Sequence, residues 1–134
     1  MHNKIPTKYY FINKFDTNII NKQDKSTAFI YRNYSKKIKI DTIIKIRRIC
    51  KLRKSKFFLS NDLRLANQLK LDGAYIPAFN HDKKHLSYNI PKNFMLIGSA
   101  HNYKEIKIKE KQGVSAIFLS SIFKQNVNYL GLNR

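Results

Sequence analysis

The sequence has a single cysteine, Cys50, and this scarcity excludes two kinds of small fold. A framework of internal disulfides needs pairs of cysteines, and structural zinc sites are usually rich in them. Cys50 lies on the apolar stripe of a helical pattern, so we expect it to fill space in a hydrophobic core.

Glycine and proline are also scarce, with four and three residues, and there is no linker rich in Gly, Ser or Pro and no internal repeat. No apolar run approaches the roughly 20 residues that span a bilayer. The start, "MHNKIPTKYYF", lacks the apolar stretch of a signal peptide. We therefore expect one domain over residues 1–134 in a soluble, cytoplasmic protein rather than a membrane protein.

Acidic residues are few: eight Asp and Glu stand against 27 Lys and Arg, a net charge of +19. Such a balance is typical of proteins that bind nucleic acid or another polyanion. The chain is, however, rich in Lys, Ile and Asn throughout, which indicates a compositional bias spread over the surface. Its six arginines are scattered, and only Arg47, Arg48 and Arg53 lie close together. We therefore expect small phosphorylated anions as partners and regard nucleic acid as the less favoured alternative.

Short apolar runs alternate along the chain with longer polar segments of helical period. The pattern predicts helices over residues 38–54, 62–71 and 102–113, and a loop between Pro77 and Pro91. Strands are predicted near residues 8–13, 27–33, 56–60, 73–77, 94–99 and 115–120. Strands this apolar, separated by helices, indicate an α/β fold of parallel strands covered by helices.

Four of the predicted strands end in polar residues: "YRNYS", "SND", "GSAH" and "SSIFK". In βα architectures the carboxyl ends of the strands form the face that binds ligands. Helix capping explains the same residues one at a time, because Asn61 or Asp62 could cap the next helix, and Asn102 likewise. Four such ends on one face favour a site.

The stretch "FFLSNDLRLANQLKLDGAYIP", followed by "IGSAHNYKE" and "GVSAIFLSSIF", resembles the thiamine-phosphate synthase family, which includes the related thiazole tautomerases. These segments run in family order from Phe57 to Phe123, and "FIYRNY" extends the match upstream. The resemblance implies a TIM-type (β/α)8 barrel, which typically needs about 200 residues or more. With about six strands the barrel is incomplete, and the sequence looks truncated at its C-terminus.

The resemblance also implies roles for individual residues. It assigns substrate binding to Arg32, Asn61 and Ser99, a magnesium-binding carboxylate to Asp62, and catalysis to His101. The polar end of the sixth strand adds three substrate-binding candidates, Ser120, Ser121 and Lys124.

Other family positions are changed. The family's histidine in the "GAYIPAFN" segment is Tyr75, its second metal carboxylate is Asn80, and "KQNVN" keeps none of the threonines of the phosphate loop. Since Mg²⁺ depends on carboxylates, we expect synthase chemistry with a pyrimidine diphosphate to be weak.

The resemblance thus implies a thiamine-biosynthesis protein that binds thiazole phosphate. A tautomerase, which needs a proton shuttle rather than a metal, and a member that binds without turnover remain alternatives, as does a basic nucleic-acid-binding module. Whether the chain forms a homo-oligomer stays open.

Histidine suits proton transfer because its pKa lies near neutrality. His101 could be that proton shuttle or simply a solvated residue at the start of a helix. His2, His81 and His85 are expected to be exposed, and a metal site at His81 and His85 would lack a third ligand.

Overall fold

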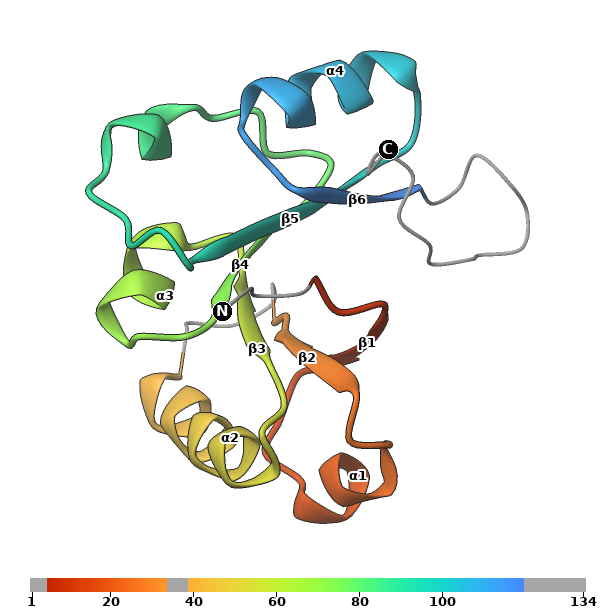
Figure 1. The fold of residues 1–134 in the computed structure, drawn as a ribbon, viewed down its shortest axis with the longest axis vertical. Coiled ribbons are helices and arrows are strands. Elements are labelled where there is room, and N and C mark those ends of the chain that lie inside the picture. The colour runs from red at the N-terminus through yellow and green to blue at the C-terminus, as the bar shows by residue number, and fades with distance from the viewer. Residues whose placement is uncertain (1–4, 34–38, 120–134) are drawn as a thin grey trace.

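The computed structural model describes residues 5–33 and 39–119. Within these ranges one parallel sheet has its strands in sequence order: β1 (Lys8–Ile12), β2 (Thr27–Tyr31), β3 (Phe57–Ser60), β4 (Gly73–Ile76), β5 (Met95–Ala100) and β6 (Ala116–Leu119). The α-helices between them are α1 (Thr17–Lys22), α2 (Ile40–Arg53), α3 (Leu63–Gln68) and α4 (Tyr103–Lys111). Figure 1 shows the sheet curling into part of a barrel with the helices around it. The prediction of an incomplete TIM-type barrel is confirmed.

Alternate side chains of each strand enter two separate cores, as the pleat of a strand requires. The inner core contains strand residues such as Ile30, Phe58 and Ile97, which are fully buried. Its aromatic rings show how far the sheet curls, because Tyr9 of β1 and Phe118 of β6 lie 4.7 Å apart between ring centroids although they belong to the first and last strands.

The outer core joins the sheet to its helices. Phe29, Leu59 and Ile76 on the strands pack with Ile43 and Ile46 of α2, all of them at most 1% exposed. Cys50 belongs to this cluster, as predicted from its place on the stripe. No helix among the described residues is long and apolar enough to cross a membrane.

The sequence pattern missed α1 because it is only six residues long and mostly polar. Asp16 begins this helix, since its Oδ1 accepts hydrogen bonds from the backbone N–H groups of Asn18 and Ile19 at 3.0 and 3.2 Å. Other boundaries are shorter than predicted: α3 ends at Gln68, and Lys70 adopts a left-handed φ of 57° two residues later.

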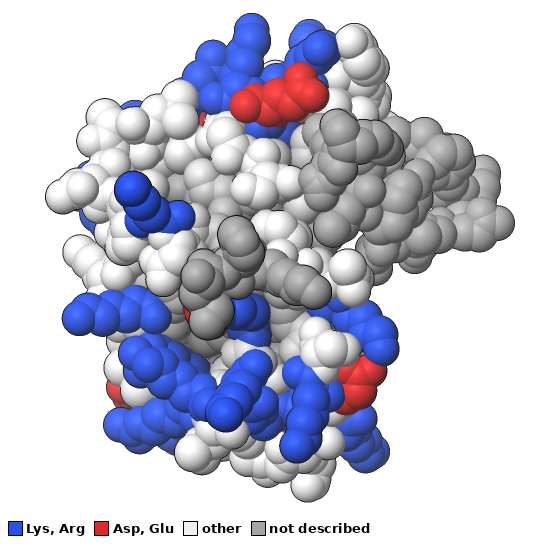
Figure 2. All heavy atoms as spheres, in the orientation of Figure 1, with Lys and Arg blue, Asp and Glu red and all other residues white. Residues whose placement is uncertain are grey.

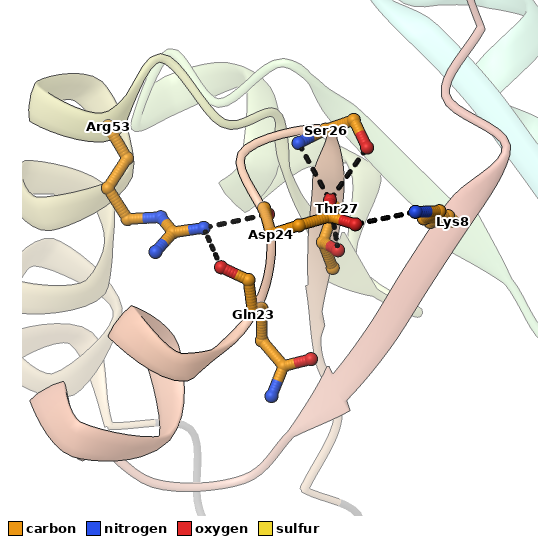
Figure 3. Close-up of polar contacts among 6 residues, drawn as sticks. All are labelled: Lys8, Gln23, Asp24, Ser26, Thr27 and Arg53. Carbon is orange, nitrogen blue, oxygen red and sulfur yellow. Dashed lines mark hydrogen bonds and ion pairs between the residues drawn. The ribbon is translucent and has the colours of Figure 1, made fainter.

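Arg53, at the end of α2, ties α1 and the turn before β2 to the rest of the fold (Figure 3). Its guanidinium donates to the carbonyl oxygens of Ile20, Gln23 and Asp24 at 2.7 to 3.0 Å. The Asp24 carboxylate in turn accepts hydrogen bonds from Ser26 and pairs with Lys8 of β1. One arginine thus fixes a turn far from it in sequence.

The connection from β4 to β5 is a long loop, as predicted, with one 3-10 turn, η1 (Lys84–Ser87). The expectation that His85 is exposed is wrong: it is 6% exposed, and its Nε2 lies 2.7 Å from the carbonyl oxygen of Gln112. The loop folds back onto the end of α4, so the histidine is covered. His81 in the same loop is exposed, as expected.

Candidate ligand site at the carboxyl ends of the strands

Three cavities open along the carboxyl ends of the strands, on the edge where the sequence placed a site. The largest, about 330 Å³, lies between β2 and β3 and includes Ser60, Asn61 and Asp62 in its lining. A second, about 200 Å³, lies at the end of β1 beside Arg32, and a third, about 100 Å³, lies beyond β4 beside Asn80. This edge is therefore hollowed and lined by polar residues that the sequence had singled out.

Asn61 occupies the first position after β3 and has a left-handed φ of 66°, which asparagine tolerates better than most residues. Its backbone N–H donates to the carbonyl oxygen of Tyr75 at 2.8 Å, and its Oδ1 accepts from the side-chain amide of Asn80 at 2.7 Å. The two amides link the loops after β3 and β4 at the mouth of the site.

Asp62 is the N-cap of α3, and its Oδ1 accepts from the backbone N–H of Leu65 at 3.0 Å. The capping alternative therefore applies to this residue. At the position where the resemblance implies a second carboxylate the chain has Asn80, and among the described residues no three His, Cys, Asp or Glu side chains are grouped to hold a metal ion. This donor set fits Mg²⁺ poorly, and the role of Asp62 as a metal ligand stays a prediction.

Ser99 points from β5 into the inner side of the sheet and is 7% exposed. Its Oγ accepts from the Tyr75 hydroxyl at 2.8 Å and from the backbone N–H of Ala78 at 3.1 Å. The tyrosine that stands in place of the family's histidine thus bonds the serine expected to touch substrate. Ser99 retains its own hydroxyl proton as a donor.

His101 follows β5 directly and forms a pair with Glu105 of α4. Its Nδ1 lies 3.0 Å from Glu105 Oε1, and its backbone N–H donates to the same oxygen at 2.7 Å. Burial acts to raise the pKa of Glu105, but the hydrogen bonds from His101 outweigh it and lower that pKa below its ordinary value. A charged carboxylate can only accept, so Nδ1 carries a proton and Nε2 of the neutral ring is left to accept one.

Arg32 lies just beyond β2 and is exposed. Its guanidinium carbon sits 3.9 Å above the centroid of the Phe11 ring, a stacking that holds the fork at the mouth of the second cavity. Its backbone N–H continues the pairing of β2 with β1 by donating to the Ile12 carbonyl at 2.9 Å. Within residues 5–33 and 39–119 no carboxylate pairs with its side chain.

The β4–β5 loop is held by two fully buried polar side chains of α4 and its C-cap, Lys109 and Gln112. Lys109 Nζ donates to the carbonyl oxygen of Asn80 at 3.0 Å, and Gln112 Nε2 donates to the carbonyl oxygens of Asn80 and Asp82, both at 2.9 Å. These bonds hold the loop in the position where the side chain of Asn80 reaches Asn61.

The structure thus brings Asn61, Asp62 and Asn80 together around two of the cavities, with Ser99 behind Tyr75. Ser120, Ser121 and Lys124 lie outside the described residues. Sequence reasoning missed Glu105 and Lys109. For Glu105 the signal was its spacing of four residues from His101, which puts both on one side of the first helical turn. A lysine in a run of lysines gives no comparable signal.

The fold and this edge define the chain as a partial (β/α) barrel with its candidate site at the carboxyl ends of the strands. A family model described as thiamine monophosphate synthase matches residues 17–130. The chain belongs to this family. A search of the curated proteins found no match.

Among solved structures, a thiamine phosphate pyrophosphorylase from Pyrococcus furiosus is similar in fold, with a TM-score of 0.58 and 19% sequence identity. The similarity covers 87% of this chain and 61% of that one, so the chain spans less than two thirds of that structure. At this identity the likeness concerns the fold alone.

Proposed function

We propose that the chain binds a phosphorylated thiazole of thiamine biosynthesis at the carboxyl ends of its strands, and that His101 transfers a proton on the bound ligand. Family membership supports the ligand class. In the reaction we propose, a proton leaves one carbon of a thiazole carboxylate phosphate and another returns elsewhere on it, so the ligand is isomerised without a metal or a leaving group.

The observation that carries the proposal is the pairing of His101 with Glu105 at 3.0 Å. Proton transfer by a neutral imidazole needs one ring nitrogen free to accept, and an ionised carboxylate on Nδ1 selects that tautomer. The lowered pKa of Glu105 keeps its carboxylate charged near neutral pH. His101 also has the access that a ligand requires, with 47% of its side chain exposed.

Arg32 is our candidate for holding a phosphate. An arginine fork matches phosphate geometry, and the stacking on Phe11 limits the rotamers of the side chain before any ligand binds. Among the described residues Arg32 forms no ion pair with a carboxylate.

Synthase chemistry has less support, since it releases pyrophosphate and calls for metal and cations on the leaving group. Among the described residues Asp62 is the one carboxylate that lines the cavity of about 330 Å³ between β2 and β3, and it already caps α3. A second candidate is binding without turnover. It is favoured by Ser99, whose oxygen already accepts from both Tyr75 and Ala78.

The test follows isomerisation of a thiazole carboxylate phosphate by NMR with the native chain and three variants. We expect His101→Ala to abolish turnover and Glu105→Gln to slow it about 10- to 100-fold, because the amide no longer fixes the tautomer. His81→Ala, at an exposed histidine of the β4–β5 loop, is the matched control and should leave the rate unchanged.

Ligand binding without isomerisation in the native chain would establish the second candidate. Magnesium-dependent formation of thiamine phosphate, with His101→Ala harmless, would contradict the proposal and identify a synthase.

A further inference from the structure

A basic groove crosses the opposite end of the sheet, where β3, β4 and β5 begin. Its main part is a cavity of about 390 Å³ between the second half of α2 and the turn before β4. An adjoining cavity of about 320 Å³ shares Lys56, Lys70 and Asp72 with it and continues to Phe94, just before β5. We call these two cavities together the basic groove.

Cations dominate the lining of this groove: Arg47, Lys51, Lys54, Lys56 and Lys70, against the single carboxylate of Asp72. Asp72 is already engaged, since it accepts from the backbone N–H of Phe57 at 2.8 Å and lies 3.9 Å from Lys56. Among the described residues the other four cations have no carboxylate partner. Their mutual repulsion would be relieved by an anion in the groove.

Two further features lie in the groove. The Nε of Arg47 is buried and has no hydrogen-bond partner among the described residues. Lys54 and Lys70 follow the ends of helices and have left-handed φ angles of 63° and 57°, a conformation that glycine usually adopts at such positions. Each of these two turns therefore places a cation at the rim of the groove.

Figure 2 shows that on the face it presents Lys and Arg gather over the lower part of the molecule, where Figure 1 places α1 and α2. A smaller group of Lys and Arg, with acidic residues beside it, lies at the top of the same face, where Figure 1 places α4.

We propose that the basic groove binds the phosphodiester backbone of single-stranded nucleic acid. Proteins bind such ligands with a positively charged groove that follows the backbone, combined with aromatic rings on which bases stack. This groove supplies the first of these, and it is extended rather than a closed pocket for one phosphate. It offers one half-buried ring, Phe94, and no exposed stacking platform in its lining, so binding depends on phosphates and has no sequence preference. A membrane surface fits less well, because the two large apolar side chains that α2 exposes, Ile40 and Leu52, lie near opposite ends of the helix rather than in one patch.

The experiment measures fluorescence anisotropy of a labelled oligothymidylate with the native chain over a series of salt concentrations. The groove variant carries Lys51→Gln and Lys54→Gln. The control variant carries Lys104→Gln and Lys111→Gln, two exposed lysines of α4, so both variants have the same net charge. Thermal unfolding of each variant separates loss of binding from loss of fold.

We expect the groove variant to bind the oligonucleotide at least about tenfold more weakly. The slope of log binding constant against log salt concentration should fall in magnitude by about 1.4, because each of the two lost phosphate contacts contributes about 0.7. The control variant should keep both values. Equal losses in the two variants would show attraction by net charge alone and overturn the proposal, as would absence of binding at about 0.1 M salt.

Binding to phosphatidylserine vesicles that Leu52→Ser removes, without oligonucleotide binding, would overturn it in favour of a membrane surface. Because the groove lies at the other end of the strands, its variants should leave binding of the thiazole ligand unchanged. The two proposals therefore fail independently.

Discussion

The side chain of Lys109 is fully buried between α4 and the sheet, and its ammonium lies 3.0 Å from the backbone carbonyl oxygen of Asn80. Its aliphatic stem crosses Gly98 of β5, where an added Cβ would come within 2.9 Å of the lysine Cδ. A buried lysine usually costs stability unless its charge is satisfied. Here that charge serves to hold a loop of the candidate site.

Lys109→Met keeps most of the stem and removes the ammonium. We expect the free energy of unfolding to change by less than about 1.5 kcal/mol, because a buried charge is exchanged for apolar volume. The β4–β5 loop should nevertheless loosen, with faster amide hydrogen exchange around Asn80 and Asp82. The control is Lys107→Met, at an exposed position of α4 two residues before Lys109. Unchanged hydrogen exchange in Lys109→Met would show that Gln112 holds the loop alone.

The same lysine should make stability depend on pH. Burial lowers the pKa of Lys109 from its ordinary 10.5 to about 8, while the nearby charge of Glu105 acts in the opposite direction. Between these values the unfolded chain holds a proton that the folded chain has lost, so the free energy of unfolding rises with pH through this window.

Burial also raises the pKa of the Cys50 thiol to about 12, which lowers stability as pH rises above about 9. The measured quantity is therefore the difference in unfolding free energy between the native chain and Lys109→Met from urea titrations. We expect the native chain to gain on the order of 2 kcal/mol relative to the variant from pH 8 to 10.5. A constant difference would mean that Lys109 keeps its ordinary pKa.

Arg53→Lys tests the tie between α2 and the turn before β2. A lysine cannot supply the planar fork that reaches three carbonyl oxygens, so we expect a loss of about 2–3 kcal/mol in unfolding free energy. Arg48→Lys, at an exposed position of the same helix, should change it by less than about 0.5 kcal/mol. Similar values for the two variants, measured by chemical denaturation, would contradict the structural role of Arg53.

Tyr75 and Ser99 should be energetically coupled through their 2.8 Å hydrogen bond. A double-mutant cycle with Tyr75→Phe and Ser99→Ala is expected to give a coupling energy of about 1 kcal/mol. Pairing Ser99→Ala with Tyr103→Phe, an exposed tyrosine of α4, provides a cycle that should give none. If Tyr75→Phe also strengthens ligand binding, the tyrosine competes with the ligand for Ser99.

Asp62 allows its capping role to be separated from a role in ligand binding. Asn caps helices as well as Asp does, so Asp62→Asn should preserve the stability that Asp62→Ala loses, about 1 kcal/mol. If Asp62 also binds Mg²⁺, Asp62→Asn should abolish magnesium-dependent ligand binding in calorimetry while leaving the fold intact. Unchanged binding would leave Asp62 as a helix cap only.

The sequence by itself determined the approximate positions of the strands and their parallel arrangement, because short apolar runs that alternate with helical periods are typical of parallel strands covered by helices. It also placed Asn61, Asp62 and His101 at strand ends, since a strand must stop where polar residues begin. Strand positions and strand ends depend on residues that are neighbours in the chain, so the local sequence pattern is sufficient to predict them. Even Asn102, expected as an N-cap, accepts from the Glu105 N–H at 2.9 Å.

Only the tertiary structure decided which of these polar groups are free. Asp62 could be read as ligand or cap until Leu65 N–H was seen to use its oxygen, and Ser99 as a substrate contact until Tyr75 reached it from the neighbouring strand. The burial of His85 and Lys109 depends on a loop that folds back over a helix more than 20 residues away. Such contacts leave no periodicity in the sequence, because the partner that buries a side chain is chosen by the packing of distant elements and not by its neighbours in the chain.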